Sequence, residues 1–306
     1  MRRLLLRGAV GIALAGLGCA PATADPQKLP TPVAPMVVPV PLHPALWKVA
    51  DADTTIYLFG TVHVMKPGPV WLDGPLAQAL DKSDELVTEI VDPAGAATQA
   101  ALLARATLPK GRNLRAMMDK PQRDAFEATL KKAGLPLDAL DKFKPWYAGV
   151  VMASLPLIQQ GLTAKSGAEA VLEARAASHP RARSGLETVD YQLKLFDSLP
   201  VKSQLAYLRS VVAEYDTIAT QIDDLVKAWG AGDAEALAKA MNADMDDPKL
   251  VQTLLTGRNR NWAQWIRTRL ARPGTVFLAV GAGHLAGKGS VQAQLSRLGI
   301  ATTRVQ

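Results

Sequence analysis

Two short apolar runs, one near each end of the chain, stop at a glycine that is followed three residues later by a histidine. The first is "YLFGTVH", which ends at His63, and the second is "VFLAVGAGH", which ends at His284. Apolar runs of this length that end at glycine are typical of buried strands. The pattern therefore predicts two strand-Gly-x-x-His units, whose histidines are 221 residues apart in sequence (284 minus 63).

The order of polar and apolar residues predicts further elements around these two units. Residues 45–60, "ALWKVADADTTIYLFG", contain two short strands joined by a turn at Asp51 to Asp53. A helix follows that is capped by Asp73 and carries Pro75 in its first turn. The segment "DELVTEIV", residues 84–91, predicts a buried strand. The closing elements are expected at 275–280 (strand), 290–298 (helix) and 300–305 (strand).

The long region between the two units, about 93–272, has helical periodicity that is interrupted by proline and glycine. Apolar residues from Val201 to Trp229 recur every three or four positions, which predicts one helix whose apolar face packs in the core. A short strand in "RARSGLETV" is expected to end near Glu187. The predicted fold class is α/β: a mixed sheet carries the two strand-Gly-x-x-His units, and a large helical insertion separates them.

The N-terminus has the pattern of a secretory signal peptide. Three arginines among the first seven residues precede an apolar stretch, Gly8 to Leu17, that is too short to span a bilayer. Small residues at Ala22 and Ala24 form a signal-peptidase site, so cleavage is expected to remove residues 1–24 and to leave Asp25 first. The mature protein is therefore expected to be periplasmic or extracellular.

A lipoprotein acylated at Cys19 is the alternative for this N-terminus. It is disfavoured because Gly16 stands three positions before Cys19, where a branched apolar residue is usual. Residues 25–44 are expected to form a linker, because seven prolines among the last nineteen of them favour extended polyproline conformations. One folded domain is expected over residues 45–306.

Charge and cysteine content exclude several classes of protein. Residues 1–24 contain three arginines and no acid, so the mature chain carries 32 basic and 28 acidic residues, a net charge of +4. The basic residues are scattered among the acidic ones, which argues against a nucleic-acid-binding surface. Without Cys19 the chain has no cysteine, so burial of apolar side chains rather than disulfides must stabilise it. No other apolar run approaches ~20 residues, so no transmembrane helix is expected in the mature chain.

The predicted strand ends supply candidate metal ligands. Residues just beyond the carboxyl ends of strands form the binding sites of open α/β sheets. His63 and His284 would each bring an imidazole to such a site, and two imidazoles suit a divalent metal ion. Glu89 is the best third ligand, because an unpaired ionised group inside the apolar "LVTEIV" strand would be costly. The alternatives are that Glu89 faces solvent and that either histidine is a hydrogen-bonded turn residue.

A nucleotide-binding site at the second glycine cluster is excluded. The segment "GAGHLA", which begins at Gly281, fits a variant of the dinucleotide fingerprint. No Asp or Glu follows Asp247, so the acid that would bind the ribose ~20 residues later is missing. A phosphate-binding loop fails as well, because Lys288 is followed by Gly289 where serine or threonine is needed.

Six segments, taken in order, resemble the TraB/GumN family, which is related to the Tiki metalloproteases. They are "YLFGTVH", "ELVTEIV", "KPWYAG", "SGLETVDYQLKLFD", "GRNRNWAQWI" and "VFLAVGAGHLAGKG". The resemblance covers about Leu46 to the C-terminus. It implies an α/β fold with a helical insertion and a divalent metal site at His63, His284 and Glu89. The ion expected from the resemblance is Mn, Co or Zn, with manganese- or cobalt-like ions favoured over a purely structural zinc.

The resemblance also marks Glu187 in "GLET", which Gln192 follows, and Arg258 with Asn259 in "RN". The local alternatives are that Glu187 caps the next helix and that Arg258 is solvated on a helix face. The hypothesis that follows is metal-assisted hydrolysis of a peptide or small-molecule substrate. Glu89 would be a ligand or the base that accepts a proton from water, and Arg258 would stabilise negative charge on the substrate carbonyl. The contrasting hypothesis is a non-catalytic periplasmic protein that binds a peptide, haem or a metal.

Overall fold

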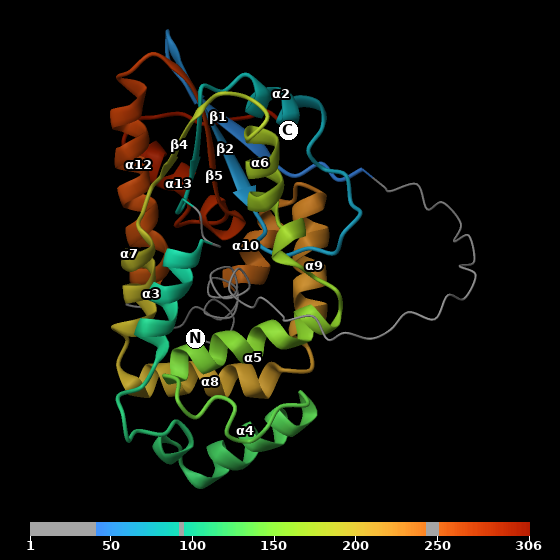
Figure 1. Ribbon diagram of the computed structural model, residues 1–306. Coiled ribbons are helices and arrows are strands. Elements are labelled where there is room, and N and C mark those ends of the chain that lie inside the picture. Colours follow the sequence, from blue (N-terminus) through green and yellow to red (C-terminus); the bar gives the residue numbers. More distant parts are fainter. Residues whose placement is uncertain (1–40, 92–94, 243–250) are drawn as a thin grey trace, which may run out of the picture.

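Six strands form one mixed sheet within the residues that the structure describes, which are 41–91, 95–242 and 251–306. The structure is a computed structural model, and Figure 1 shows the sheet with helices on both of its faces. The strand order is β4-β3-β5-β2-β1-β6. The strands are β1 (Leu46–Ala50), β2 (Thr54–Thr61), β3 (Glu85–Thr88), β4 (Ala182–Gly185), β5 (Gly274–Gly281) and β6 (Thr303–Arg304).

The four strands β4, β3, β5 and β2 run parallel to one another, whereas β1 pairs antiparallel with β2, and β6 pairs antiparallel with β1. β1 and β2 form a hairpin that is stabilised by Asp51, whose Oδ1 accepts a hydrogen bond of 2.9 Å from the Thr54 amide. The parallel strands are connected through helical crossovers, so their carboxyl ends share one edge of the sheet. At that edge Thr61, the last residue of β2, lies opposite Gly281, the last residue of β5.

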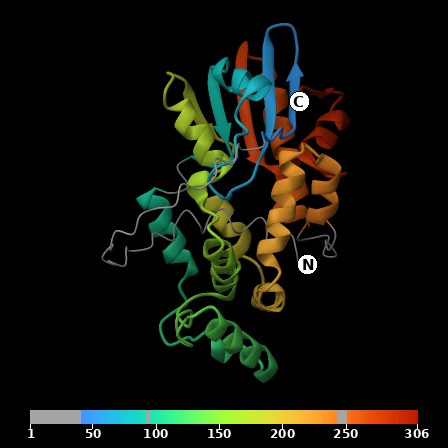
Figure 2. The ribbon, with the colours of Figure 1, turned by 90° about the vertical axis from the view of Figure 1, so that its right-hand side faces the viewer.

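Most of the remaining described chain is helical. The α-helices are α2 (Gly74–Asp81), α3 (Ala96–Ala106), α4 (Lys120–Lys132), α5 (Pro145–Gln159), α6 (Ala168–Ala176), α7 (Val189–Asp197), α8 (Val201–Glu214), α9 (Ile218–Gly230), α10 (Ala234–Asn242), α12 (Gly257–Leu270) and α13 (Val291–Arg297). Shorter helical turns are η1 (Arg115–Met117), η2 (Ala164–Ser166), η3 (Gln252–Thr256) and η4 (Ala282–Leu285). Figures 1 and 2 show α4, α5 and α8 as a helical layer beyond the carboxyl ends of the parallel strands.

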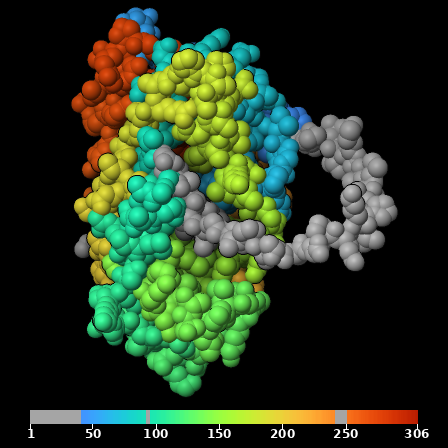
Figure 3. Space-filling view, viewed as in Figure 1, coloured from blue at the N-terminus to red at the C-terminus, as the bar shows by residue number. Residues whose placement is uncertain are grey.

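Helices cover both faces of β2 and β5, which explains why these two strands are buried along most of their length rather than on alternate residues. The edge strand β4 is short and mostly exposed. Leu58 and Leu278 face one side of the sheet, where they pack against residues of α12 and α13. Phe59 and Phe277 face the other side, towards α2, α6 and α9. In Figure 3 the yellow-green residues of the α6 region lie over the sheet on the side facing the viewer. The sheet is therefore the middle of three layers.

An aromatic cluster joins the helical insertion to the sheet. The rings of Phe59 and Trp71 are stacked with their centroids 5.6 Å apart, and Trp229 of α9 meets both rings edge-on. The indole N–H of Trp229 also donates a hydrogen bond of 2.7 Å to the carbonyl of Gly60, near the end of β2. α9 is thereby anchored to the strand that precedes His63.

The structure confirms the predicted fold class, a mixed α/β sheet with a large helical region between the two histidine units. β4 interrupts that helical region, as expected from "RARSGLETV", and it ends at Gly185. The predicted signal peptide and most of the predicted linker fall on residues 1–40, outside the described residues. Among the described residues no helix combines the length and the apolar character that a membrane span needs.

The prediction of a single helix from Val201 to Trp229 was wrong. α8 ends at Glu214, residues 215–217 form a turn, and α9 begins at Ile218. The hydroxyl of Thr217 donates a hydrogen bond of 3.0 Å to the carbonyl of Glu214, which is a local alternative to continued helix. The apolar spacing of the sequence continues across the turn, and Ile218, the first residue of α9, is buried as this spacing predicts.

Candidate active site

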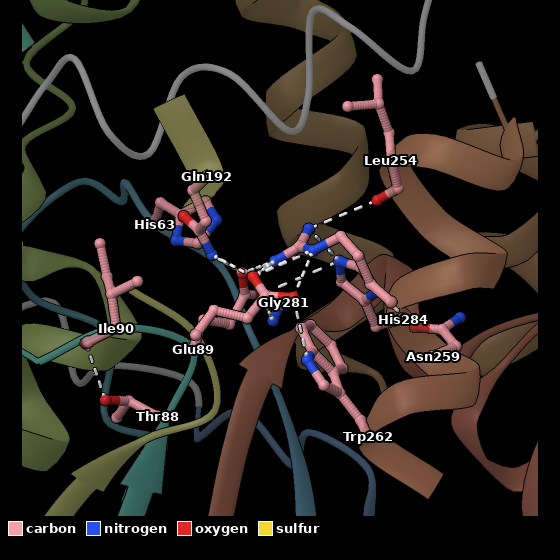
Figure 4. A network of polar contacts seen from close by, with 12 residues as sticks. His63, Thr88, Glu89, Ile90, Gln192, Leu254, Asn259, Trp262, Gly281 and His284 are labelled. Atoms are coloured by element: carbon pink, nitrogen blue, oxygen red, sulfur yellow. Dashed lines mark hydrogen bonds and ion pairs between the residues drawn. The ribbon is translucent and has the colours of Figure 1, made fainter. Parts of the chain in front are cut away.

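The carboxyl edge of the sheet brings together every side chain that was predicted to form the site. His63 lies two residues after β2, Glu89 one residue after β3, and Glu187 two residues after β4. His284 lies in η4, directly after β5, and Arg258 comes from the first turn of α12. Figure 4 shows His63 and His284 on either side of Glu89. Strand order thus gathers residues that are up to 221 positions apart in sequence.

The position of Glu89 corrects the prediction that it lies inside a strand over residues 84–91. β3 ends at Thr88, whose hydroxyl donates a hydrogen bond of 2.9 Å to the carbonyl of Ile90 and bends the chain around Glu89. The glutamate therefore follows the strand, as the two histidines do. A residue just past a strand end can turn its side chain over the edge of the sheet, where a ligand can reach it.

The two glycines of the Gly-x-x-His units are required by close packing. A Cβ atom on Gly60 would lie 3.0 Å from the Cα of Ala282, so the first unit touches the second. A Cβ atom on Gly281 would lie 3.2 Å from Oε1 of Glu89 and 3.8 Å from Nε2 of His63, with Cδ2 of His284 at 3.6 Å. The three predicted ligands thus converge on Gly281, and a Cβ atom there would press on Glu89 while it only touched the two histidines.

Arg258 occupies the centre of the site. Its Nη2 donates hydrogen bonds to Oε2 of Glu89 (2.6 Å) and Oε2 of Glu187 (2.7 Å), and its Nη1 lies 3.1 Å from Nε2 of His284. The guanidinium is buried and stacks on Trp262, with 4.7 Å between its Cζ and the ring centroid. Burial lowers the pKa of Arg258, but the two carboxylates outweigh it and raise that pKa, so Arg258 stays charged. The alternative of a solvated arginine is therefore wrong.

Glu89 is held as a carboxylate by donors on both oxygens. Oε1 accepts the backbone N–H of Gly281 (2.8 Å), and Oε2 accepts from Arg258 and from Nε2 of Gln192 (2.9 Å). Burial raises the pKa of Glu89, but the positive charge of Arg258, the histidines when they are protonated and the Gly281 N–H outweigh burial and lower it. The net pKa lies well below the usual range. Glu89 is thus an ionised hydrogen-bond acceptor at neutral pH.

Glu187 supports the site and is not a helix cap. Its carboxylate accepts hydrogen bonds from Nε of Arg258 (2.9 Å), Nε2 of Gln192 (2.9 Å) and Nε1 of Trp262 (3.1 Å). The capping group of α7 is Thr188, whose hydroxyl accepts a hydrogen bond of 3.2 Å from the amide of Tyr191. Glu187 and Gln192 therefore hold Arg258 and Glu89 in a fixed arrangement.

His284 is fixed as a neutral imidazole with Nε2 facing the site. Its Nδ1 lies 2.5 Å from Oδ1 of Asn259, whose amide nitrogen donates a hydrogen bond of 2.8 Å to the carbonyl of Gly289. Because Asn259 offers only its oxygen to the ring, Nδ1 carries the proton, and the lone pair of Nε2 accepts a hydrogen bond of 3.1 Å from Nη1 of Arg258. Burial, followed by the positive charge of Arg258, lowers the pKa of His284 to about 3.

His63 is anchored differently, by a carboxylate. Its Nδ1 lies 2.6 Å from Oε1 of Glu169, which stands in the first turn of α6. Burial lowers the pKa of His63, but the charge and the hydrogen bond of Glu169 outweigh it and raise the pKa to about 9. Glu169 was not predicted from the sequence, since an acidic residue in a first helical turn is common and gives no signal of its own.

The donor atoms suit a divalent ion in type and in orientation. Each imidazole is hydrogen-bonded through Nδ1 to a side-chain oxygen and has its Nε2 on the side of Glu89. Metal-binding histidines are usually oriented in this way. The spacing is not that of a closed ligand set, because no three His, Cys, Asp or Glu side chains among the described residues are placed to hold an ion. Arg258 lies between Glu89 and His284 instead. His179 lies outside this cluster, on an exposed loop after α6.

The fold and site define an α/β protein with a buried His/Glu/Arg cluster at the carboxyl edge of its parallel strands. The chain belongs to the TraB/PrgY/gumN family, whose profile matches residues 45–304. It is similar to the uncharacterized protein YbaP of Escherichia coli K12, with 23% identity over 257 residues that cover 82% of this chain and 92% of YbaP. YbaP of Shigella flexneri is 23% identical over 244 residues, or 78% and 87% of the two chains. No solved structure matches this chain significantly.

Proposed function

We propose that this protein is an exported, metal-dependent hydrolase of the metallopeptidase type. One observation carries the proposal: two imidazoles, each anchored through Nδ1, and the ionised Glu89 converge on Gly281 beside the buried Arg258. Nε2 of His63 and Nε2 of His284 would bind a divalent ion such as Mn, Co or Zn, with Glu89 as the third ligand or as a base. A bound ion of this kind supplies Lewis acidity and lowers the pKa of water.

The residues of the chain have separate tasks in this proposal. Glu89 is ionised and available as a ligand, because the pKa of its carboxyl lies well below the usual range. The same low pKa makes it a weak proton acceptor unless substrate or ion binding changes its partners. Arg258 keeps a permanent positive charge at the site and would stabilise negative charge that develops on a substrate carbonyl. Glu187 and Gln192 hold Arg258 and Glu89 in position. A peptide or another amide is the substrate class, a choice that rests on the resemblance to the Tiki metalloproteases.

Metal binding and hydrolysis are tested together with purified, metal-free mature protein. Titration calorimetry with Mn²⁺, Co²⁺ and Zn²⁺ should give about one bound ion, and hydrolysis of a peptide library should depend on that ion. His63→Ala and His284→Ala should each weaken binding strongly, whereas the control His179→Ala should bind normally. Equal affinity in all three variants would exclude the site, and binding without hydrolysis would favour the non-catalytic binding protein.

Export is tested by the mass of the protein recovered from the periplasm. Signal-peptidase cleavage after Ala24 predicts a chain that begins at Asp25 and lacks Cys19. A mass that includes Cys19 with a diacylglycerol group would instead establish a lipoprotein. A chain that keeps residues 1–24 inside the cell would contradict export.

A further inference from the structure

Among the residues that the structure describes, Glu169 is the ion-pair partner of His63, and it lies outside the predicted site. Its Oε1 is 2.6 Å from Nδ1 of His63, and the two side chains are 23% and 30% exposed. The ring nitrogen that Glu169 engages is the one away from Gly281, since Nε2 of His63 lies on the side of that glycine. The contact therefore determines which way the imidazole faces.

The backbone around Glu169 is locked to the segment that carries His63. The amide of Ala168 donates a hydrogen bond of 2.9 Å to the carbonyl of Val62, and Met65 and Thr163 exchange two backbone hydrogen bonds of 3.3 and 2.9 Å. Gly167 lies so close that a Cβ atom there would be 2.1 Å from the carbonyl oxygen of His63. The start of α6 is thus hydrogen-bonded to the segment that follows β2, and this contact holds Glu169 beside the ring.

The two histidines of the site have unlike partners. Asn259, a neutral amide, holds Nδ1 of His284, whereas an ionised carboxylate holds Nδ1 of His63. A carboxylate behind an imidazole fixes its orientation and makes Nε2 a stronger electron-pair donor than an amide does.

We propose that Glu169 is a positioning residue that orients His63 and strengthens its Nε2 as a ligand, an inference that rests on the proposed ion binding at this site. The alternative is an ordinary ion pair that stabilises α6 and has no link to the site. Glu173 supplies the comparison, because it lies one turn further along α6 and pairs with Arg183 at 3.0 Å on the surface.

A double-mutant cycle separates positioning from a purely structural role. Binding of Mn²⁺ is measured by calorimetry on metal-free mature protein and on Glu169→Ala, His63→Ala and the double variant. Glu169→Ala should weaken binding by roughly 10- to 100-fold, the usual scale for such partners. In the His63→Ala background the same substitution should change the affinity no further, because the ligand it acts through is gone. Glu173→Gln should bind like the wild type.

A second readout needs no metal. In ¹H–¹⁵N spectra of metal-free protein, the hydrogen-bonded imidazole N–H that disappears in His63→Ala should also disappear in Glu169→Ala and persist in Glu173→Gln. Glu169→Gln keeps an acceptor oxygen without the charge, so it should retain the resonance and lose part of the affinity. It also serves as the test if Glu169→Ala does not fold.

Each outcome separates this inference from the proposed function. Normal Mn²⁺ affinity in Glu169→Ala would overturn the positioning role while leaving the ion site intact, and so would an equal loss in the wild-type and His63→Ala backgrounds. If the wild type binds none of the three ions, the proposed function falls and Glu169 has no ligand to strengthen. A resonance that depends on Glu169 would then still support its orientation of His63.

Discussion

At the residue scale, the site depends on atoms that satisfy one another inside the protein. Glu89 receives hydrogen bonds on both oxygens, and the same donor groups of Arg258 and Gln192 also serve Glu187. Burying this many charges is costly unless each is paired. Removing one partner should therefore lower the free energy of unfolding more than a typical surface substitution does.

The substitution Glu89→Gln tests this pairing and the role of Glu89. An NH₂ group would replace one carboxylate oxygen and face a donor from Gly281 or Arg258, so we expect the free energy of unfolding to fall by about 1–3 kcal/mol. Urea denaturation measures the change, and the surface variant Glu173→Gln is expected to shift it by under about 0.5 kcal/mol.

The same variant distinguishes a base from a ligand. As a base, Glu89 would be needed for the reaction, so the variant should keep its ion affinity and lose roughly 10²-fold in rate. As a ligand, Glu89 would be needed for the ion, so affinity itself should fall, because an amide oxygen is a weaker donor than a carboxylate. Unchanged stability, binding and hydrolysis would contradict both roles.

At the element scale, Arg115 connects the short helix η1 to α4 and to the turn that follows α4. Arg115 donates two hydrogen bonds to Asp141, of 2.8 and 2.6 Å, and a third of 2.9 Å to Glu127 of α4. The hydrogen bonds of Arg115 lower the pKa of Asp141, although its partial burial opposes this. Two parallel N–H···O bonds of this kind are stronger than a single exposed ion pair.

Asp141→Asn should destabilise the protein by about 1 kcal/mol at pH 7. Since the pKa of Asp141 is lower in the folded than in the unfolded state, its contribution is present above the unfolded pKa of about 3.9 and is lost as the pH falls through the folded pKa. Urea denaturation at pH 7 and pH 3 should therefore show a smaller difference between variant and wild type at pH 3. The control Asp124→Asn removes a more exposed pair with Lys120 and should have little effect.

The elements that the sequence predicted are those whose signal is local. The Gly-x-x-His units could be found because the apolar run, the glycine and the histidine lie within seven to nine residues. The break between α8 and α9 could not be predicted, because the apolar spacing continues through the turn unchanged. Glu169 could not be predicted either, because its place beside the site depends on a contact with His63, 106 positions earlier (169 minus 63). Strand pairing and helix docking bring such distant residues together, and no short segment encodes either of them.

At the scale of the whole molecule, the candidate site draws on every major part of the chain. His63, Glu89 and His284 follow strands of the sheet, Glu187 follows a strand within the helical insertion, and Arg258 begins the helix that returns the chain to the sheet. No single fragment contains the proposed ligand set, so the proposed ion would bind there only when the domain is folded. Ion binding should therefore stabilise the whole fold.

Thermal unfolding of metal-free protein with and without the preferred ion measures this coupling. At a free ion concentration 100 times the Kd, binding to the folded state alone contributes about 2.7 kcal/mol. For a domain of this size that corresponds to a rise in Tm of roughly 5–10 °C, since 1 kcal/mol shifts Tm by about 2–4 °C. A chelator should reverse the rise, His63→Ala should abolish it, and His179→Ala should preserve it. An equal rise in His63→Ala would show that the ion binds elsewhere on the protein, because the site at the carboxyl edge would have lost its first ligand.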